Sequence, residues 1–295
     1  MRFIDLHTHS TCSDGTSTPT DLVREATEAN LGAISLTDHD TMAGVAEAIN
    51  AGVKAGIEVI SGVELSANHD GKAVHVLGYG LDRFNLNMQT MLADLQTIRK
   101  NRNKQILEKL AGLTINIDRD ELIASSSGLV GRPHIARMLV EQKVVHNFDQ
   151  AFKKYLGKDG LAYVETERYP ATETFKIIKD AGGLAVLAHP TTFEKSLNRL
   201  NETIRYLHKH GLDGVEAIYP GHTRKICDSL FNLAEKLDMV VTGGSDFHGS
   251  VKQGIFIGGA PVMPPVPYDL FNKIKKRLPP NLQSTSPPAQ GSAIP

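Results

Sequence analysis

The sequence predicts an α/β protein built on a parallel sheet or barrel. In residues 1–66, short apolar segments alternate with amphipathic helical patterns, and the same alternation returns after Thr172. This β-α-β rhythm is typical of parallel sheets, whose functional side chains collect at the carboxyl ends of the strands. Side chains that can bind metals follow several of the predicted strands, so the rhythm also indicates where a site lies.

Two histidines near the end of the first predicted strand, residues 3–9, indicate a metal site. Residues two apart in a strand point to the same face, so His7 and His9 can reach one ion. In a helix they would lie about 200° apart. Asp14 follows in a loop where Gly15 permits a sharp turn. Taken alone, the pair is also typical of a strand end with two solvated histidines.

The next elements bring further ligands to the same edge. Thr18 is the expected N-cap of the first helix, and Pro19 suits its first turn. Parallel strands end at one edge of a sheet, so His39 and Glu64 are expected near the two histidines of the first strand. The predicted order is helix 19–30, strand 33–37, helix 42–55 and strand 57–65.

The rhythm then changes. A further strand is predicted over residues 73–80, with His75 near its start. No convincing strand follows between residues 81 and 160, so residues 81–165 are predicted to form a helical insertion that covers the site and carries His134 to it. The helices predicted here are 87–110, 118–125, one that begins at 132–134, and 149–156.

The alternation of strands and helices resumes after Thr172 and ends in a tail, residues 279–295. That tail is rich in Pro, Ser and Gln, and we expect it to be disordered. The elements predicted before it are a helix that ends at 181, strand 184–187, helix 197–210, strand 214–218, helix 223–237, strand 239–242, a weaker strand 253–257 and helix 269–277.

Composition excludes several classes of protein. The 295 residues include 32 basic and 33 acidic ones, which gives no global charge for coating nucleic acid or an anionic membrane. Only two cysteines occur, Cys12 and Cys227, which argues against a disulfide framework and favours a reducing compartment. No apolar run approaches the roughly 18 residues of a membrane span, and the first residues lack a signal-peptide pattern. We expect a cytoplasmic protein with no membrane or DNA partner.

Ten residues form the candidate site, and most follow a strand. Histidine and carboxylate without thiolate suit Zn, Mn or Fe(II) rather than Ca or an iron–sulfur cluster. Ten ligands exceed what one ion needs, so two or three ions at roughly 3.5–4 Å spacing are predicted, with Glu64 as a bridge. His75 could instead be a core histidine, and His134 a helix-start residue. The ten are His7, His9, Asp14, His39, Glu64, His75, His134, His189, Asp246 and His248.

Six short motifs, in this order, resemble those of the polymerase and histidinol phosphatase (PHP) family: H-x-H-x4-D, T-D-H-D, G-V-E, R-P-H, A-H-P and S-D-x-H. The similarity covers about residues 1–260. R-P-H within a helical insertion, together with A-H-P, resembles the branch that acts on nucleoside 3′,5′-bisphosphates and on the 5′ ends of short RNAs. The resemblance implies a distorted (β/α)7 barrel made of residues 1–80 and 166–278, interrupted by the insertion.

The resemblance also implies three divalent ions, with Mn²⁺ favoured and Zn²⁺, Fe²⁺ or Mg²⁺ as alternatives. The ligands carried over are His7, His9, Glu64 and Asp246 for the first ion, Glu64, His75 and His134 for the second, and Asp14, His39 and His248 for the third.

Phosphate chemistry suggests roles for the remaining residues. Divalent ions neutralise a phosphate monoester and lower the pKa of water, and Asp246 is expected to orient the attacking hydroxide. His189 is expected to bind the phosphate and, unless a water does so, to protonate the leaving oxygen. Arg132, at a helix start, is expected to bind an anion. The hydroxyls of Ser125, Ser126 and Ser127 either assist it or belong to a plain polar loop.

The leading hypothesis is therefore a metal-dependent phosphatase that converts a nucleoside 3′,5′-bisphosphate, such as adenosine 3′,5′-bisphosphate, to the 5′-monophosphate. It extends to 5′-to-3′ trimming of short RNA. Two alternatives stay open, a histidinol-phosphate phosphatase and a non-catalytic metal-binding module.

Overall fold

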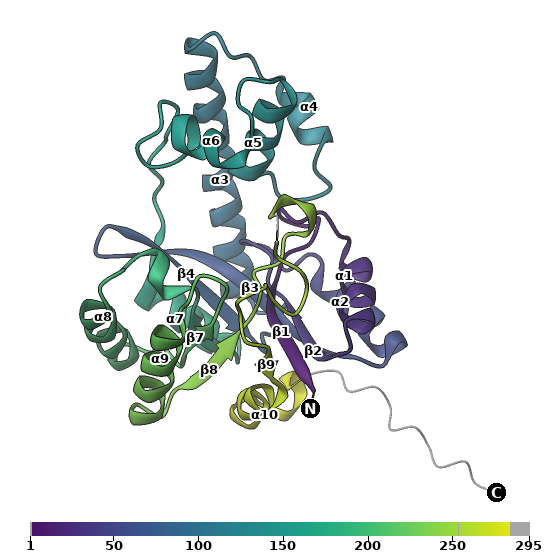
Figure 1. Cartoon of the computed structure of the whole chain (residues 1–295), viewed down its shortest axis with the longest axis vertical. Coiled ribbons are helices and arrows are strands. Elements are labelled where there is room, and N and C mark those ends of the chain that lie inside the picture. Colours follow the sequence, from purple (N-terminus) through teal and green to yellow (C-terminus); the bar gives the residue numbers. More distant parts are fainter. Residues whose placement is uncertain (1, 253, 284–295) are drawn as a thin grey trace, which may run out of the picture.

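The computed structural model describes residues 2–252 and 254–283, and its centre is one strongly curved sheet. The strands run in the order β8-β7-β6-β4-β3-β2-β1-β9, with β5 beside β3 (Figure 1). The bounds are β1 Phe3–Thr8, β2 Leu31–Leu36, β3 Glu58–His69, β4 Lys72–Tyr79, β5 Tyr169–Pro170, β6 Leu184–Leu187, β7 Gly214–Ile218, β8 Val240–Gly243 and β9 Val266–Pro267.

The sheet nearly closes into a barrel at its carboxyl edge. Beyond β8 the chain returns to the end of β1, where Thr8 and Phe247 form a parallel bridge and the His9 N–H donates to the Phe247 carbonyl at 2.9 Å. Segments from the two ends of the sequence therefore meet beside the site. The α/β barrel with a helical insertion that the sequence predicts is confirmed.

Two strands depart from the parallel pattern, and the short β9 is one of them, since it runs antiparallel to β1. β4 runs antiparallel to both β3 and β6, because a tight hairpin joins it to β3. Asp70 and Gly71 turn this hairpin with positive φ angles of 48° and 72°, as a two-residue hairpin loop requires. The hairpin makes β3 longer than predicted and brings His75 on β4 across from Ser66.

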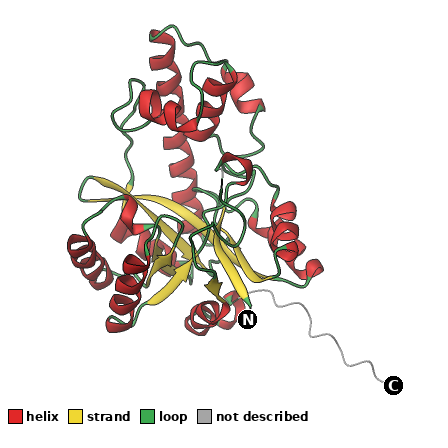
Figure 2. Cartoon of the chain, in the orientation of Figure 1, coloured by secondary structure: helices red, strands yellow, loops and turns green. Residues whose placement is uncertain are grey.

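Helices cover the outside of the sheet (Figure 2). The expected cap of the first is present, since the Thr18 side chain accepts from the Asp21 N–H. These helices are α1 Pro19–Glu28, α2 Val45–Ala55, α7 Ala171–Asp180, α8 Leu197–Lys209, α9 Arg224–Lys236 and α10 Tyr268–Arg277.

The region between β4 and β5 is helical and carries a core of its own. The first half of α3 packs on the barrel core through Met88 and Leu95, whereas Ile106 and Leu110 in its second half belong to a separate core with the other helices of this region. Figure 1 shows those helices at the end of α3 that projects away from the sheet. The elements are α3 Leu86–Gly112, α4 Arg119–Ala124, α5 Arg132–Glu141, α6 Phe148–Ala151 and the π-helical turn Phe152–Leu156.

Near the carboxyl end, the sequence predicts a weak strand and a disordered tail. The weak strand over 253–257 is wrong for its described part, because residues 254–257 form only an isolated bridge between Phe256 and Gly259. Residue 253 lies outside the described residues, as do residues 284–295 of the predicted disordered tail. The described part of that tail includes a 3-10 turn, Pro280–Leu282. No helix among the described residues is long and apolar enough to cross a membrane.

Candidate metal and phosphate site

The first group of candidate ligands gathers around the buried end of β1. Nε2 of His9 lies 3.2 Å from a carboxylate oxygen of Glu64 and 3.3 Å from a carboxylate oxygen of Asp246. The Nε2 of His7 lies 3.3 Å from Glu64 and 3.5 Å from Asp246. One ligand atom from each of these four residues lies within 4.8 Å of the others. They are the four residues predicted to hold the first ion.

A buried glutamate that the sequence reasoning missed orients His7. Oε1 of Glu216, on β7, lies 2.9 Å from Nδ1 of His7. A carboxylate only accepts, so Nδ1 carries the proton and Nε2 is free to bind a metal. The second oxygen of Glu216 accepts from the backbone N–H of His189 at 2.6 Å. A carboxylate inside a fully buried strand, G-V-E-A-I, was the signal available in the sequence.

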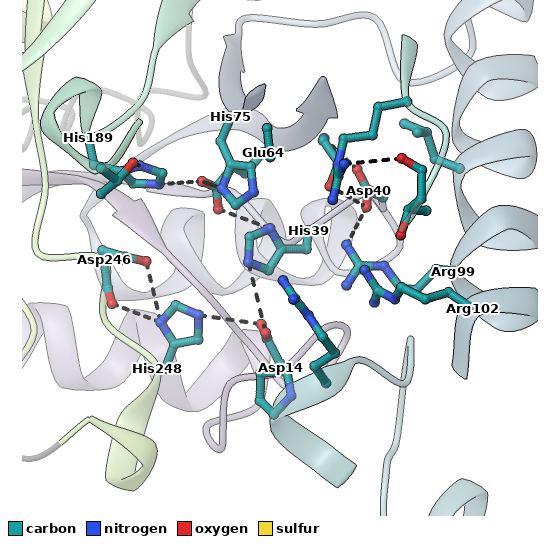
Figure 3. A pocket seen from close by; sticks show the side chains of 18 of the residues that line it. Asp14, His39, Asp40, Glu64, His75, Arg99, Arg102, His189, Asp246 and His248 are labelled. Atoms are coloured by element: carbon teal, nitrogen blue, oxygen red, sulfur yellow. Dashed lines mark hydrogen bonds and ion pairs between the residues drawn. The ribbon is translucent and has the colours of Figure 1, made fainter. Parts of the chain in front are cut away.

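Two further groups share members with the first. His9, Asp14, His39 and His248 form one, and it contains the three residues predicted for the third ion. His39, Glu64 and His75 form the other. Figure 3 shows Glu64 between His39, His75 and His189, with His248 between Asp14 and Asp246. The structure therefore brings together eight of the nine predicted metal ligands.

The ninth, His134, belongs to none of these groups among the described residues. Its Nδ1 accepts the Gly131 N–H at 3.1 Å, so the neutral ring carries its proton on Nε2. Burial lowers the pKa of His134, which favours this neutral form. A ring that accepts at one nitrogen and carries a proton on the other has no lone pair left for a metal. The structure thus favours His134 as a hydrogen-bond donor.

His189 lies where His134 was predicted to be. Its Nε2 is 2.8 Å from Glu64 Oε1, and Nδ1 of His75 is 2.7 Å from the same oxygen. The other ring nitrogen of His189 is 3.1 Å from the Thr192 hydroxyl. Both ring nitrogens therefore contact side chains of the site, and they hold His189 beside Glu64 and His75.

The polar atoms of these groups fit metal ions. Five of them are buried without a hydrogen-bond partner: His7 Nε2, both ring nitrogens of His9, His39 Nδ1 and Glu64 Oε2. A buried polar atom left without a partner costs about 1–3 kcal/mol. Divalent ions between these nitrogen and oxygen atoms would satisfy all of them, and the absence of thiolate suits Zn, Mn or Fe(II).

The carboxylates of the site stay ionised. Burial alone would raise the pKa of Glu64, but His39, His75 and His7 hold it well below its usual value. Burial likewise opposes ionisation of Asp14, and His39 and His248 outweigh it. Ionised carboxylates are the form that binds cations.

A cavity of about 370 Å³ opens over the ligand groups, and arginines line its other wall. Figure 3 shows Arg99 and Arg102 entering from the side opposite His189 and Asp246. Arg132 is held by a hydrogen bond from its Nη1 to the Leu156 carbonyl at 3.1 Å. The full set, called the arginine cluster below, is Arg99, Arg102, Arg132 and Arg168.

The arginine cluster has the properties of an anion site. Arg99 pairs with Asp40, but Nε and Nη2 of Arg102 are buried with no hydrogen-bond partner. Burial, together with the charges of Arg99 and Arg132, lowers the pKa of Arg102 to about 9. An anion that binds beside Arg102 would supply the missing acceptor and offset the repulsion between these like charges.

Only Arg132 of this cluster was predicted. Arg99 and Arg102 are three apart on one helix and share a face, which was a usable signal. Arg168 lines the cavity as well, although no pattern in the sequence indicates it. The three predicted serines do not line it in the described chain: Ser125 donates to the Leu122 carbonyl at 2.8 Å, and Ser126 to that of Gly128 at 3.2 Å.

Comparison with known proteins shows the family of this chain. A family model described as the PHP domain matches residues 5–168. The chain belongs to the PHP family. A 5′-3′ exoribonuclease of Haemophilus influenzae is 37% identical over 244 residues, 83% of this chain and 89% of that protein. A 3′,5′-nucleoside bisphosphate phosphatase of Chromobacterium violaceum is 29% identical over 280 residues, 94% and 98% of the two chains.

A solved structure agrees with the fold of this PHP protein. A Bifidobacterium adolescentis protein, predicted to be a metal-dependent phosphoesterase, superposes with a TM-score of 0.86 at 31% identity, covering 94% of this chain and 97% of that one. The chain thus has the fold of a family of metal-dependent phosphoesterases, and it carries histidine–carboxylate groups able to bind metal.

Proposed function

We propose that this PHP protein removes the 3′-phosphate from nucleoside 3′,5′-bisphosphates, with divalent metals as cofactors. The observation that supports it is a cavity with two sites for anions on opposite walls, the metal-ligand groups and the arginine cluster. A substrate with a single phosphate would leave one of them without a partner. A bisphosphate fills both.

The residues divide by role. Bound metals would neutralise the scissile phosphate and lower the pKa of the attacking water. Asp246 would orient that water, and the arginine cluster would hold the second phosphate. His134, with its proton on Nε2, is a donor beside Arg132. The proposed ligand sets are His7, His9, Glu64 and Asp246; Glu64, His75 and His189; and Asp14, His39 and His248.

Trimming of RNA from its 5′ end is a second candidate, supported by the relative named a 5′-3′ exoribonuclease. The same two sites serve both reactions. A 5′-phosphate on the arginine cluster would place the next phosphorus of the chain at the metals, as a monoester in a bisphosphate and as a diester in RNA.

The two alternatives from the sequence are less compatible with the cavity. Histidinol phosphate carries a protonated amine, which four neighbouring arginines would repel. A non-catalytic module would not need an arginine cluster facing its metal groups.

The test compares adenosine 3′,5′-bisphosphate with adenosine 3′-monophosphate in a phosphate-release assay with added Mn²⁺. A charge-assisted hydrogen bond contributes about 1.5–3 kcal/mol, so Arg102→Gln should lower kcat/KM for the bisphosphate by about 10- to 150-fold. The same change should leave the 3′-monophosphate nearly unaffected. Lys100→Gln, at an exposed position of the same helix, is the matched control.

Equal kcat/KM for the two substrates in the parent protein would defeat the bisphosphatase proposal. If Arg102→Gln lowers kcat/KM equally for both substrates, the arginine cluster holds the scissile phosphate instead. A 5′-phosphorylated short RNA, assayed beside them for release of mononucleotides, tests the second candidate.

A further inference from the structure

A lysine outside the three ligand groups contacts one of their members. Lys252 follows the 3-10 turn Gly249–Val251 and lines the cavity beside Tyr219. Its side chain is 40% exposed, and its Nζ lies 2.5 Å from Oδ2 of Asp246. The roles of the ligand groups and of the arginine cluster do not explain why this lysine contacts Asp246.

The two oxygens of Asp246 have different partners. Oδ1 lies 3.3 Å from His9 Nε2 and 3.5 Å from His7 Nε2, so it faces the first ligand group. Oδ2 accepts from Lys252 on the other side, and from the Tyr219 hydroxyl at 3.3 Å. An oxygen held by an ammonium group and a hydroxyl has its lone pairs in use. Only Oδ1 is therefore presented to the histidines.

We propose that Lys252 is a positioning residue that limits Asp246 to binding a metal through one oxygen. The proposal rests on the proposed function, because it concerns the same metal site. Carboxylates bind metals through one oxygen or both, and the one-oxygen mode leaves a position for water or a substrate oxygen. Lys252 holds Oδ2 away and so keeps that position available.

The experiment uses Lys252→Met and Lys252→Arg, with Lys273→Met at an exposed position of α10 as the control. In Lys252→Met, kcat for adenosine 3′,5′-bisphosphate should fall by about 10- to 100-fold, the usual effect of losing a group that orients a metal ligand. KM should hardly change, because Lys252 acts on Asp246 and not on substrate. Lys252→Arg retains a cation and should recover much of the loss.

The second readout is the visible absorption of each protein loaded with Co²⁺. It should weaken in Lys252→Met, because Asp246 then supplies both oxygens and the coordination number rises. The metal content should stay that of the parent, since a cation near the metal has been removed. Lys273→Met should match the parent in both readouts.

Three results would overturn the proposal: an unchanged Co²⁺ spectrum, loss of the metal, or a rise in KM with kcat unaltered. The last would mean that Lys252 binds the substrate. The Co²⁺ spectrum needs no substrate, so it separates this proposal from the proposed function. A parent protein inactive on bisphosphates would refute the proposed function and leave the spectroscopic test in place.

Discussion

Replacing Glu216 by glutamine should weaken metal binding while leaving the packing of the barrel unchanged. Glu216 is fully buried, and its two oxygens face two N–H groups: His7 Nδ1 at 2.9 Å and the backbone N of His189 at 2.6 Å. Glutamine has the same shape, but one of its two positions becomes an NH₂ donor. In either orientation of the amide, its NH₂ group faces one of these two N–H donors.

Each orientation has a cost that can be worked out. If the NH₂ faces His7, the ring proton must move to Nε2, and that nitrogen is then no longer a ligand. If it faces His189, a buried backbone N–H loses its acceptor, at about 1–3 kcal/mol. Loss of the hydrogen bond to the non-ligating nitrogen of a metal-binding histidine typically lowers metal affinity by about 10–100-fold, or about 1.4–2.8 kcal/mol. This free energy is similar to the cost of the unpaired backbone N–H.

The assay is calorimetric titration of Mn²⁺ into metal-free protein, with thermal unfolding to check the fold. Glu216→Gln should raise Kd by about 10–100-fold. Glu235→Gln, an exposed position on α9, should leave Kd unchanged. An unchanged Kd in Glu216→Gln would refute the argument that Glu216 sets the tautomer of His7.

Two further predictions concern the metals and the second core. A chelator should abolish phosphate release and Mn²⁺ should restore it, because divalent ions both neutralise the phosphate and lower the pKa of the attacking water. Full activity in protein shown by elemental analysis to be metal-free would contradict this. Ile106→Ala, fully buried in the second core, should lower the free energy of unfolding by about 2–5 kcal/mol in urea denaturation. Gln105→Ala, exposed beside it, should change that free energy by less than about 0.5 kcal/mol, and an equal loss in both variants would show that Ile106 contributes no packing.

Strand geometry explains why most of the metal site is predictable from the sequence. The two-residue repeat puts His7 and His9 on one face, and parallel strands bring Glu64 to the same edge. These relations are local, or follow from the sheet alone. The sequence motifs add Asp14 and His248, which lie in loops that no periodicity describes.

Which of the two histidines, His134 or His189, lies beside Glu64 could not be predicted in the same way. R-P-H and A-H-P both place a histidine after a turn, and only tertiary packing decides which ring reaches Glu64. Nδ1 of His134 accepts the Gly131 N–H at the start of its own helix, so a local hydrogen bond already occupies this nitrogen. His189 is fixed by Glu216, a residue from another strand, through its backbone N–H.

The arginine cluster shows a related limit. The helical repeat puts Arg99 and Arg102 on one face of α3, but it does not say whether that face meets solvent or the site. Asp40 decides this. It lies next to His39 in a left-handed conformation, with φ of 53°, and its carboxylate accepts from the Ser66 N–H at 2.8 Å and pairs with Arg99.

Asp40 therefore joins the metal-ligand groups to Arg99 of the arginine cluster. Its carbonyl also accepts from Gln96 Nε2 at 3.0 Å, so α3 is attached to the barrel at two points one turn apart. Because His39 is the neighbouring residue, the separation between the metal-ligand groups and Arg99 is set by a short, buried and hydrogen-bonded segment. A cavity whose two charged walls are held by the same residue can select a substrate by the spacing of its two phosphates. This is the property that discriminating a bisphosphate from a monophosphate requires.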